Sequence, residues 1–209
     1  NLTAPQTVHL SPDEQERADR FKVDKPRQQF TAARSALRLL LGKYLSAEPT
    51  SIEFNYAEHG KPSIQSPATD IQFNVSHSHD YALLAFAKEL SLGVDIEWLG
   101  RTAEIDALAK RFYSPDEQDQ LTALSAGARH DAFLKCWTQK EAYLKAHGSG
   151  LSRDTRTFSV SIDGGLISDE QDPGANSKWS IQSLAPAEGY CAAIAAGVPE
   201  FSVQTFSLT

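Results

Sequence analysis

A short sequence that occurs twice sets the strongest limit on what this chain can fold into. The residues Ser11-Pro12-Asp13-Glu14-Gln15 return as Ser114-Pro115-Asp116-Glu117-Gln118, at an offset of 103. At the same offset Phe30 meets Phe133, and each phenylalanine opens a segment with helical apolar spacing. Capping sequences of this kind are common, so coincidence is the alternative. We nevertheless expect two related halves, residues 1–101 and 102–209, which meet near Gly100–Thr102.

The elements expected in the two halves follow the same order. Serine, proline and acids at Ser11 and Ser114 are typical of a helix start, and a longer helix is expected over Phe30–Leu45. The fold class that we predict is therefore α+β, a pseudo-twofold pair of similar halves in one chain. The expected strands are Ile52–Ala57, Phe73–Val75, Tyr81–Ala87 and Leu92–Trp98 in the first half, and Thr157–Ile162, Leu166–Asp169, Tyr190–Ala196 and Phe201–Leu208 in the second.

Charge and cysteine content exclude several classes of protein. The formal net charge of -7 argues against a nucleic-acid partner, which would require a broad basic face. The two cysteines, Cys136 and Cys191, lie in apolar contexts typical of buried thiols in a reducing compartment. No apolar run approaches the length of a membrane span, and no signal peptide is recognised. We expect a cytoplasmic protein that binds no membrane.

Two acids lie on one face of an apolar strand. In Leu92-Gly93-Val94-Asp95-Ile96-Glu97, residues two apart share a face, so Asp95 and Glu97 should project side by side. Burying both acids is costly unless a cation or hydrogen bonds compensate. The alternative is a strand end at which both acids face water.

The second long helix carries a further acid and a cation. Trp137, Glu141 and Lys145 are spaced four residues apart and share one face of the helix. Either the pair of Glu141 and Lys145 is an ordinary surface pair, or Glu141 lies at the border of the core.

A small polar turn is the third feature. Asn74-Val75-Ser76-His77-Ser78 follows Gly60-Lys61-Pro62 in the chain. Hydroxyl groups, a histidine and a nearby lysine suit phosphate oxygens, although such a sequence is more often only a turn.

Together, these motifs resemble the surfactin-type (Sfp-type) 4'-phosphopantetheinyl transferases. The resemblance rests on Asn-Val-Ser-His-Ser, Gly-Val-Asp-Ile-Glu and Trp-x-x-Lys-Glu-Ala-x-x-Lys in this order, and extends from Ser11 through Gly197. It implies a monomeric enzyme of two α+β halves with its active site in the cleft between them. The implied reaction moves the phosphopantetheine arm of coenzyme A onto a serine of an apo acyl, peptidyl or aryl carrier protein and releases adenosine 3',5'-bisphosphate. Such enzymes serve fatty-acid, polyketide, nonribosomal-peptide or siderophore synthesis.

The resemblance also implies roles for individual residues. Asp95, Glu97 and Glu141 match the family's magnesium-binding acids, and magnesium prefers oxygen ligands shared with substrate phosphates. Glu141 is our first choice for general base and Lys145 for holding the pyrophosphate, with Asp95 as the third catalytic residue. The positions expected to contact coenzyme A are Arg17, Lys61, Pro62, Ser76, His77 and Lys145.

Some positions depart from the family pattern or allow two interpretations. Glu14 and Gln29 stand where some relatives carry basic residues, and Arg34 and Arg38 either compensate for this or form a solvated helix face. Glu117 either supports catalysis or belongs to a capping box. Candidates for docking the carrier protein are Lys110, Arg111, Phe112 and Tyr113, although core packing is the favoured alternative for Phe112.

The repeat predicts a single metal site. At the offset of 103 Arg38 corresponds to Glu141, and the counterparts of Asp95 and Glu97 are Gln204 and Phe206, so the second cleft should lack acids. Two rival functions remain: a magnesium-dependent pyrophosphohydrolase acting on coenzyme A, and a binding protein with a relic site.

Overall fold

The repeated Ser-Pro-Asp-Glu sequence begins a helix in each half. The computed structural model describes residues 8–102 and 104–208. In it α1 (Pro12–Asp19) and α4 (Pro115–Thr122) follow Ser11 and Ser114 as N-caps. The backbone N–H of Ser11 donates to Glu14 at 3.1 Å, and that of Ser114 donates to Glu117 at 2.8 Å. Each acid therefore closes a capping box that satisfies a backbone donor at the helix end.

The two long helices match in length. Helix α2 (Asp24–Leu45) and helix α5 (Ala126–His147) each have 22 residues. Helix α2 begins at Asp24, earlier than the expected start at Phe30. Helix α5 ends at His147 and is capped by Gly148, whose φ of 84° is a left-handed conformation that glycine adopts readily.

A buried ion pair joins the short helix to the long one in each half and corrects the register of the repeat. Arg38 Nε donates to Glu14 Oε2 at 2.5 Å, and Lys140 Nζ donates to Glu117 at 2.7 Å. Arg38 is thus the counterpart of Lys140, at an offset of 102, and not of Glu141 as the offset of 103 predicted. Glu141 corresponds instead to Leu39, so this position of the first half still carries no acid.

Short antiparallel ladders surround the long helices. In the first half they join β1 (Glu53–Tyr56) to β2 (Pro62–Ser66) and β3 (Ile71–Ser78) to β4 (Tyr81–Lys88). In the second half β6 (Phe158–Val160) pairs with β7 (Leu166–Asp169). The strand β5 (Leu92–Trp98) follows β4 in sequence but forms a sheet with β9 (Tyr190–Ala196) and β8 (Ser180–Leu184) in the order β5-β9-β8.

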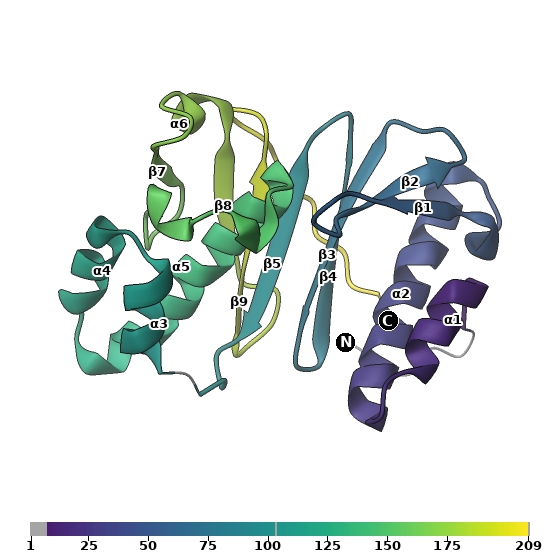
Figure 1. Cartoon of the computed structure of the whole chain (residues 1–209), viewed down its shortest axis with the longest axis horizontal. Coiled ribbons are helices and arrows are strands. Elements are labelled where there is room, and N and C mark those ends of the chain that lie inside the picture. Colours follow the sequence, from purple (N-terminus) through teal and green to yellow (C-terminus); the bar gives the residue numbers. More distant parts are fainter. Residues whose placement is uncertain (1–7, 103, 209) are drawn as a thin grey trace.

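The mixed α+β class is confirmed. Figure 1 shows two bodies side by side, with β5 and α5 on one side of the junction and the β3–β4 hairpin and α2 on the other. The core of the second body includes Leu134, Tyr143 and Phe158, and that of the first includes Leu37, Leu41 and Phe73. The boundary at residues 101 and 102 stays a prediction, because the last strand of the first segment pairs with the second body.

Seven of the eight predicted strands are present, and one is wrong. Residues 201–208, all of them described, form no strand, so the expected mirror of Asp95 and Glu97 at Gln204 and Phe206 is not built. Phe206 is 84% exposed there, since nothing covers its ring. The sequence prediction missed β2, β8 and the helices α3 (Ile105–Phe112) and α6 (Ala175–Lys178). No helix in the described ranges is long and apolar enough to cross a membrane.

Candidate active site

The close packing of α5 on β5 depends on Gly93. A Cβ atom at this position would lie 2.2 Å from the Ala142 carbonyl oxygen and 2.2 Å from the Ala146 nitrogen. Only a residue without a side chain therefore lets the backbone of α5 come this close. Because side chains alternate along a strand, Asp95 and Glu97 point to the same side as Gly93, toward α5.

Asp95 is buried and tied to both neighbouring elements. Its residue is 5% exposed, and its Oδ1 accepts hydrogen bonds from Lys145 Nζ at 2.6 Å and from Ser76 Oγ at 2.7 Å. Its Oδ2 is buried and has no hydrogen-bond partner among the described residues. The interpretation of Asp95 as a solvated strand end is therefore wrong.

Glu97 lies at the more open end of the strand. Its Oε2 accepts from Ser78 Oγ at 2.9 Å and its Oε1 from Arg101 at 2.8 Å. Burial raises the pKa of Glu97, the hydrogen bond from Ser78 opposes this, and the charge of Asp95 adds to the rise. The charge of Asp95 therefore acts directly on the carboxyl group of Glu97.

Glu141 faces these acids from α5. Burial and then the charge of Asp95 raise its pKa to about 7, while Lys145 opposes the shift. Its Oε1 is buried without a hydrogen-bond partner among the described residues. A carboxylate that titrates near neutrality suits a group that accepts a proton.

The carboxylate oxygens of these acids are suitable ligands for a hard cation, although the side chains do not have the geometry of a complete metal site. In the described ranges, no group of three or more His, Cys, Asp or Glu side chains has the geometry to hold a metal ion. Yet Asp95 Oδ2 and Glu141 Oε1 are unpaired carboxylate oxygens on facing elements. Such oxygens are the ligands that magnesium prefers.

Lys145 and Ser76 belong to the same cluster. Lys145 Nζ donates to Asp95, to Ser76 Oγ at 3.1 Å and to the Val94 carbonyl at 3.2 Å. Its side chain is 27% exposed, so part of this lysine faces solvent. Ser76 is buried and bridges this lysine and Asp95.

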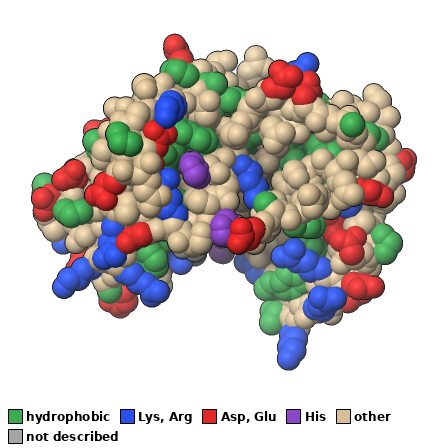
Figure 2. All heavy atoms as spheres, turned by 45° about the horizontal axis from the view of Figure 1, so that its top comes forward, with side chains coloured by type: hydrophobic (Ala, Val, Ile, Leu, Met, Phe, Trp, Pro, Cys, Tyr) green, Lys and Arg blue, Asp and Glu red, His purple; other side chains and the backbone are tan. Residues whose placement is uncertain are grey.

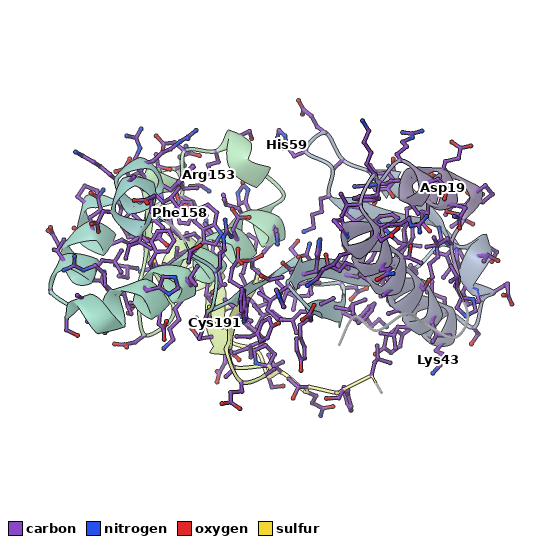
Figure 3. All side chains as sticks on the ribbon, turned by 90° about the horizontal axis from the view of Figure 1, so that it is seen from below. Asp19, Lys43, His59, Arg153, Phe158 and Cys191 are labelled. Atoms are coloured by element: carbon purple, nitrogen blue, oxygen red, sulfur yellow. The ribbon has the colours of Figure 1, made fainter. Side chains whose placement is uncertain are left out.

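The turn before β2 contacts the second body through hydrogen bonds. Lys61 Nζ donates to the carbonyls of Leu92 at 3.1 Å and Ala146 at 3.2 Å, and burial lowers its pKa. Pro62 follows as the first residue of β2. Figure 3 shows His59 at the end of this turn, reaching toward the second body, where its Nε2 lies 3.4 Å from Ser152 Oγ.

His77 lies near the cluster, whereas Arg17 does not. The pKa of His77 is lowered because the surrounding protein displaces part of its water and because Lys145 lies nearby. Histidine and basic side chains surround the hollow between the two bodies in Figure 2. Arg17 instead stacks on Phe30 at 5.1 Å and lines a separate surface cavity of about 610 Å³. Its helix α1 lies on the outer side of α2 (Figure 1).

Several open interpretations are decided by burial. Arg38 is 2% exposed and is held by Glu14, so it is neither a solvated residue nor a free phosphate ligand. Glu117 is fully buried, completes its capping box and binds Lys140, which makes its role structural. Gln29, the other position that departs from the family pattern, donates to the carbonyl of His79.

Only some of the residues predicted to dock the carrier protein are exposed. Tyr113 is fully buried and donates to the Phe133 carbonyl at 2.6 Å, so its inclusion among the docking residues is wrong. Phe112 packs edge-on against Trp137. Arg111 and Phe112 line a cavity of about 410 Å³ together with Ser152, Arg153, Asp154, Thr155 and Arg156.

Four residues of the site were not among the predicted site residues: Asn74, Ser78 and Gly93, which lie inside the quoted motifs, and Arg101. Asn74 Oδ1 accepts from the Val94 N–H at 2.9 Å, and Ser78 binds Glu97. Asn74 and Ser78 could have been identified from the sequence. Asn74, Ser76 and Ser78 are spaced two residues apart, which places their side chains on one side of a strand.

The chain matches known proteins along both segments. Residues 91–195 match the 4'-phosphopantetheinyl transferase superfamily, and residues 4–89 match the N-terminal family of 4'-phosphopantetheinyl transferase. The 4'-phosphopantetheinyl transferase HetI of a Nostoc species is 37% identical over 188 residues, 89% of this chain and 78% of the relative. The 4'-phosphopantetheinyl transferase Sfp of Bacillus subtilis is 31% identical over 194 residues, 92% of this chain and 84% of the relative.

A solved structure overlaps with part of the chain. The crystal structure of Thermotoga maritima holo-[acyl-carrier-protein] synthase covers 53% of this chain and 65% of its own, with a TM-score of 0.42 and 17% identity. The assignment rests on the sequence matches, which cover both bodies. This chain belongs to the 4'-phosphopantetheinyl transferase superfamily.

Proposed function

We propose that this protein transfers the 4'-phosphopantetheine arm of coenzyme A onto a serine hydroxyl of an apo carrier protein. The observation that carries the proposal is the cluster of Asp95, Glu97, Glu141 and Lys145, assembled from β5 and α5 in a member of this family. Three acids beside one partly exposed lysine suit phosphoryl transfer, in which positioning and charge neutralisation supply most of the catalysis.

The reaction exchanges one phosphorus–oxygen bond for another. The serine oxygen forms a bond to the β-phosphorus of coenzyme A, and the bond to the leaving adenosine 3',5'-bisphosphate breaks. Glu141 accepts the serine proton, a role suited to a carboxylate whose pKa is raised by burial and by the charge of Asp95. Lys145 holds the pyrophosphate, and Asp95 orients Lys145 through their hydrogen bond of 2.6 Å.

Magnesium is the cofactor that this donor set favours. Asp95, Glu97 and Glu141 would hold the ion, and the unpaired oxygens of Asp95 and Glu141 support this assignment. When bound, it supplies positive charge to the pyrophosphate.

Coenzyme A is expected to contact Arg17, Lys61, Pro62, Ser76, His77 and Lys145. Lys61, Ser76 and Lys145 are close to β5 in the structure, which supports their part of this set. The carrier would dock at Lys110, Arg111 and Phe112, where Arg111 offers a local positive charge on a chain whose net charge is -7.

The active form proposed is a cytoplasmic monomer. Residues from both bodies of one chain contribute to the cluster, so no second copy is needed to build it. The thiols of Cys136 and Cys191 are free and buried, as suits a reducing compartment. Sedimentation should find activity in the single-chain species, and activity confined to a dimer or trimer would contradict this proposal.

Mass spectrometry of candidate apo carriers tests the function. Incubation with coenzyme A, magnesium and the wild-type protein should add one phosphopantetheine to the carrier serine. The Asp95→Ala variant should lose the activity by about a thousandfold or more while it stays folded. The matched control, Asp131→Ala, removes an exposed acid and should transfer normally. Release of adenosine 3',5'-bisphosphate without a gain in carrier mass would indicate the rival pyrophosphohydrolase.

A further inference from the structure

Among the described residues, the strand that carries the acids pairs with another strand on one edge only. Strand β5 pairs with β9, and in an antiparallel ladder the backbone groups of successive residues face alternate edges. The N–H groups of Val94 and Trp98 face the edge away from β9. There they donate to side chains of β3, to Asn74 Oδ1 at 2.9 Å and to Ser78 Oγ at 3.1 Å.

The side chains of β3 replace a strand at this edge. Asn74, Ser76 and Ser78 alternate along β3 and all reach β5. Asn74 is only 5% exposed, so its loss would leave the Val94 N–H without a partner in a dry environment. An unsatisfied buried donor of this kind costs about 1–3 kcal/mol.

The hydrogen bonds of Asn74 and Ser78 lie on either side of the segment that carries Asp95 and Glu97. Asn74 holds the residue before Asp95, and Ser78 holds both the residue after Glu97 and the carboxylate of Glu97 itself, at 2.9 Å. Lys145 also donates to the carbonyl of Val94 at 3.2 Å. A shift of this edge would therefore move both acids and the cation together.

We propose that Asn74 and Ser78 are positioning residues for the transfer, which fix Asp95 and Glu97 by serving as side-chain substitutes for a neighbouring strand. The proposal rests on the proposed function for its kinetic consequence, but its structural part does not. A misplacement of about 1 Å in a reacting group can lower a rate about a hundredfold. Two side chains that fix the position of β5 are therefore sufficient to affect the transfer rate.

Site-resolved amide hydrogen exchange tests the structural part without a carrier protein. In Asn74→Ala, exchange at the Val94 amide should rise about tenfold or more, and in Ser78→Ala the same should occur at Trp98. The amides of Gly93 and Asp95 face β9 and should keep their protection. Gln72→Ala is the matched control, because Gln72 is an exposed residue of the same strand. Unchanged exchange at both Val94 and Trp98 overturns the proposal.

Steady-state kinetics test the positioning role. Both alanine variants should lower kcat about tenfold or more while KM for coenzyme A changes less than about threefold, and Ser78→Thr, which keeps the hydroxyl, should restore kcat. Normal kcat despite faster exchange overturns the proposal, as does a rise in KM that accounts for the whole loss. A Ser78→Ala chain that does not fold also counts against it, since the role would then be structural. If the wild-type protein transfers nothing, the proposed function fails, and the exchange data alone still decide whether Asn74 and Ser78 hold β5.

Discussion

Glu141 and Lys145 lie on one helix turn, yet the structure surrounds them differently. Glu141 is close to two other acids and has an unpaired buried oxygen, whereas Lys145 already binds Asp95 and remains 27% exposed. Proton acceptance and phosphate binding can therefore be separated by substitution at these two positions.

Glu141→Gln should lower turnover severely while coenzyme A still binds. The amide keeps the size of the side chain but cannot accept the serine proton. In the wild type, the single-turnover rate should rise with pH as Glu141 loses its proton, and this rise should vanish in the variant. Near-normal turnover with the same pH profile would mean that Glu141 is not the base.

Lys145→Ala should weaken binding and turnover together. The ammonium group is proposed to meet the pyrophosphate before and during transfer, so its loss affects both states. Calorimetry with coenzyme A measures the first effect and single-turnover transfer the second. Because the two residues share one site, the double variant should be strongly non-additive. Intact affinity in Lys145→Ala would remove the residue from the phosphate site.

Asp169 gives the fold a dependence on acid. It is buried, which by itself raises its pKa, but hydrogen bonds from Tyr143 at 2.6 Å, from the Gln171 N–H and from Arg153 outweigh burial and lower the pKa below its usual value. A carboxyl with a depressed folded pKa stabilises the native state above its unfolded pKa. This stabilisation is lost as the pH falls through the folded pKa.

Asp169→Asn should therefore destabilise the protein at pH 7 and reduce the loss of stability below about pH 4. Thermal unfolding between pH 7 and pH 3 measures both effects. Asp131→Asn, at an exposed position, is the control and should keep the wild-type profile. A variant curve parallel to the wild-type curve throughout would contradict this assignment.

At the level of elements, the distance between α5 and β5 depends on one glycine. Gly93→Ala would place a Cβ 2.2 Å from two backbone atoms of α5, so the helix must move away from the strand. Such overpacking typically costs about 1–3 kcal/mol. It should also separate Glu141 from Asp95.

The expected result for Gly93→Ala is a lower unfolding temperature together with a loss of transfer of about tenfold or more. Circular dichroism and the carrier assay measure the two effects. Gly127→Ala is the matched control in α5, because a Cβ there meets nothing within 4 Å and alanine favours a helix by about 1 kcal/mol. Full activity in Gly93→Ala would show that the close approach is not needed.

At the level of the molecule, a buried ion pair ties the short helix to the long helix in each body. Glu117 with Lys140 and Glu14 with Arg38 are almost completely excluded from water. Removal of Lys140 leaves the charge of Glu117 uncompensated in the core, which typically costs about 3–5 kcal/mol. Glu14 keeps a second cation, because Arg34 Nε lies 3.4 Å from its Oε1.

Lys140→Met should therefore destabilise the protein by about 3–5 kcal/mol. Arg38→Met should also destabilise it, because the carbonyls of Pro49 and Ile52 lose their donor while Arg34 still faces Glu14. Denaturant unfolding measures the change. Arg156→Met removes an exposed pair with Asp154 and should change stability by less than about 1 kcal/mol. A small effect of Lys140→Met together with a large effect of Arg38→Met would contradict this expectation.

Local patterns in the sequence were sufficient for the helix starts at Ser11 and Ser114, for seven strands and for the acids of the site. Helix caps at Ser11 and Ser114 and the alternation around Asp95 involve neighbours a few residues apart, so they can be read along the chain. The grouping of Asp95, Glu97, Glu141 and Lys145 followed from the resemblance of the motifs to the transferase family. The structure brings these four residues together.

Only the tertiary structure decided how distant segments meet. It set the true counterpart of Arg38 at Lys140, paired β5 with β9 and left residues 201–208 without a strand. It also showed that Ser76 and Lys61 hold β5. These outcomes depend on long-range pairing and packing, which decide which buried donor finds which acceptor, and no local periodicity encodes that choice.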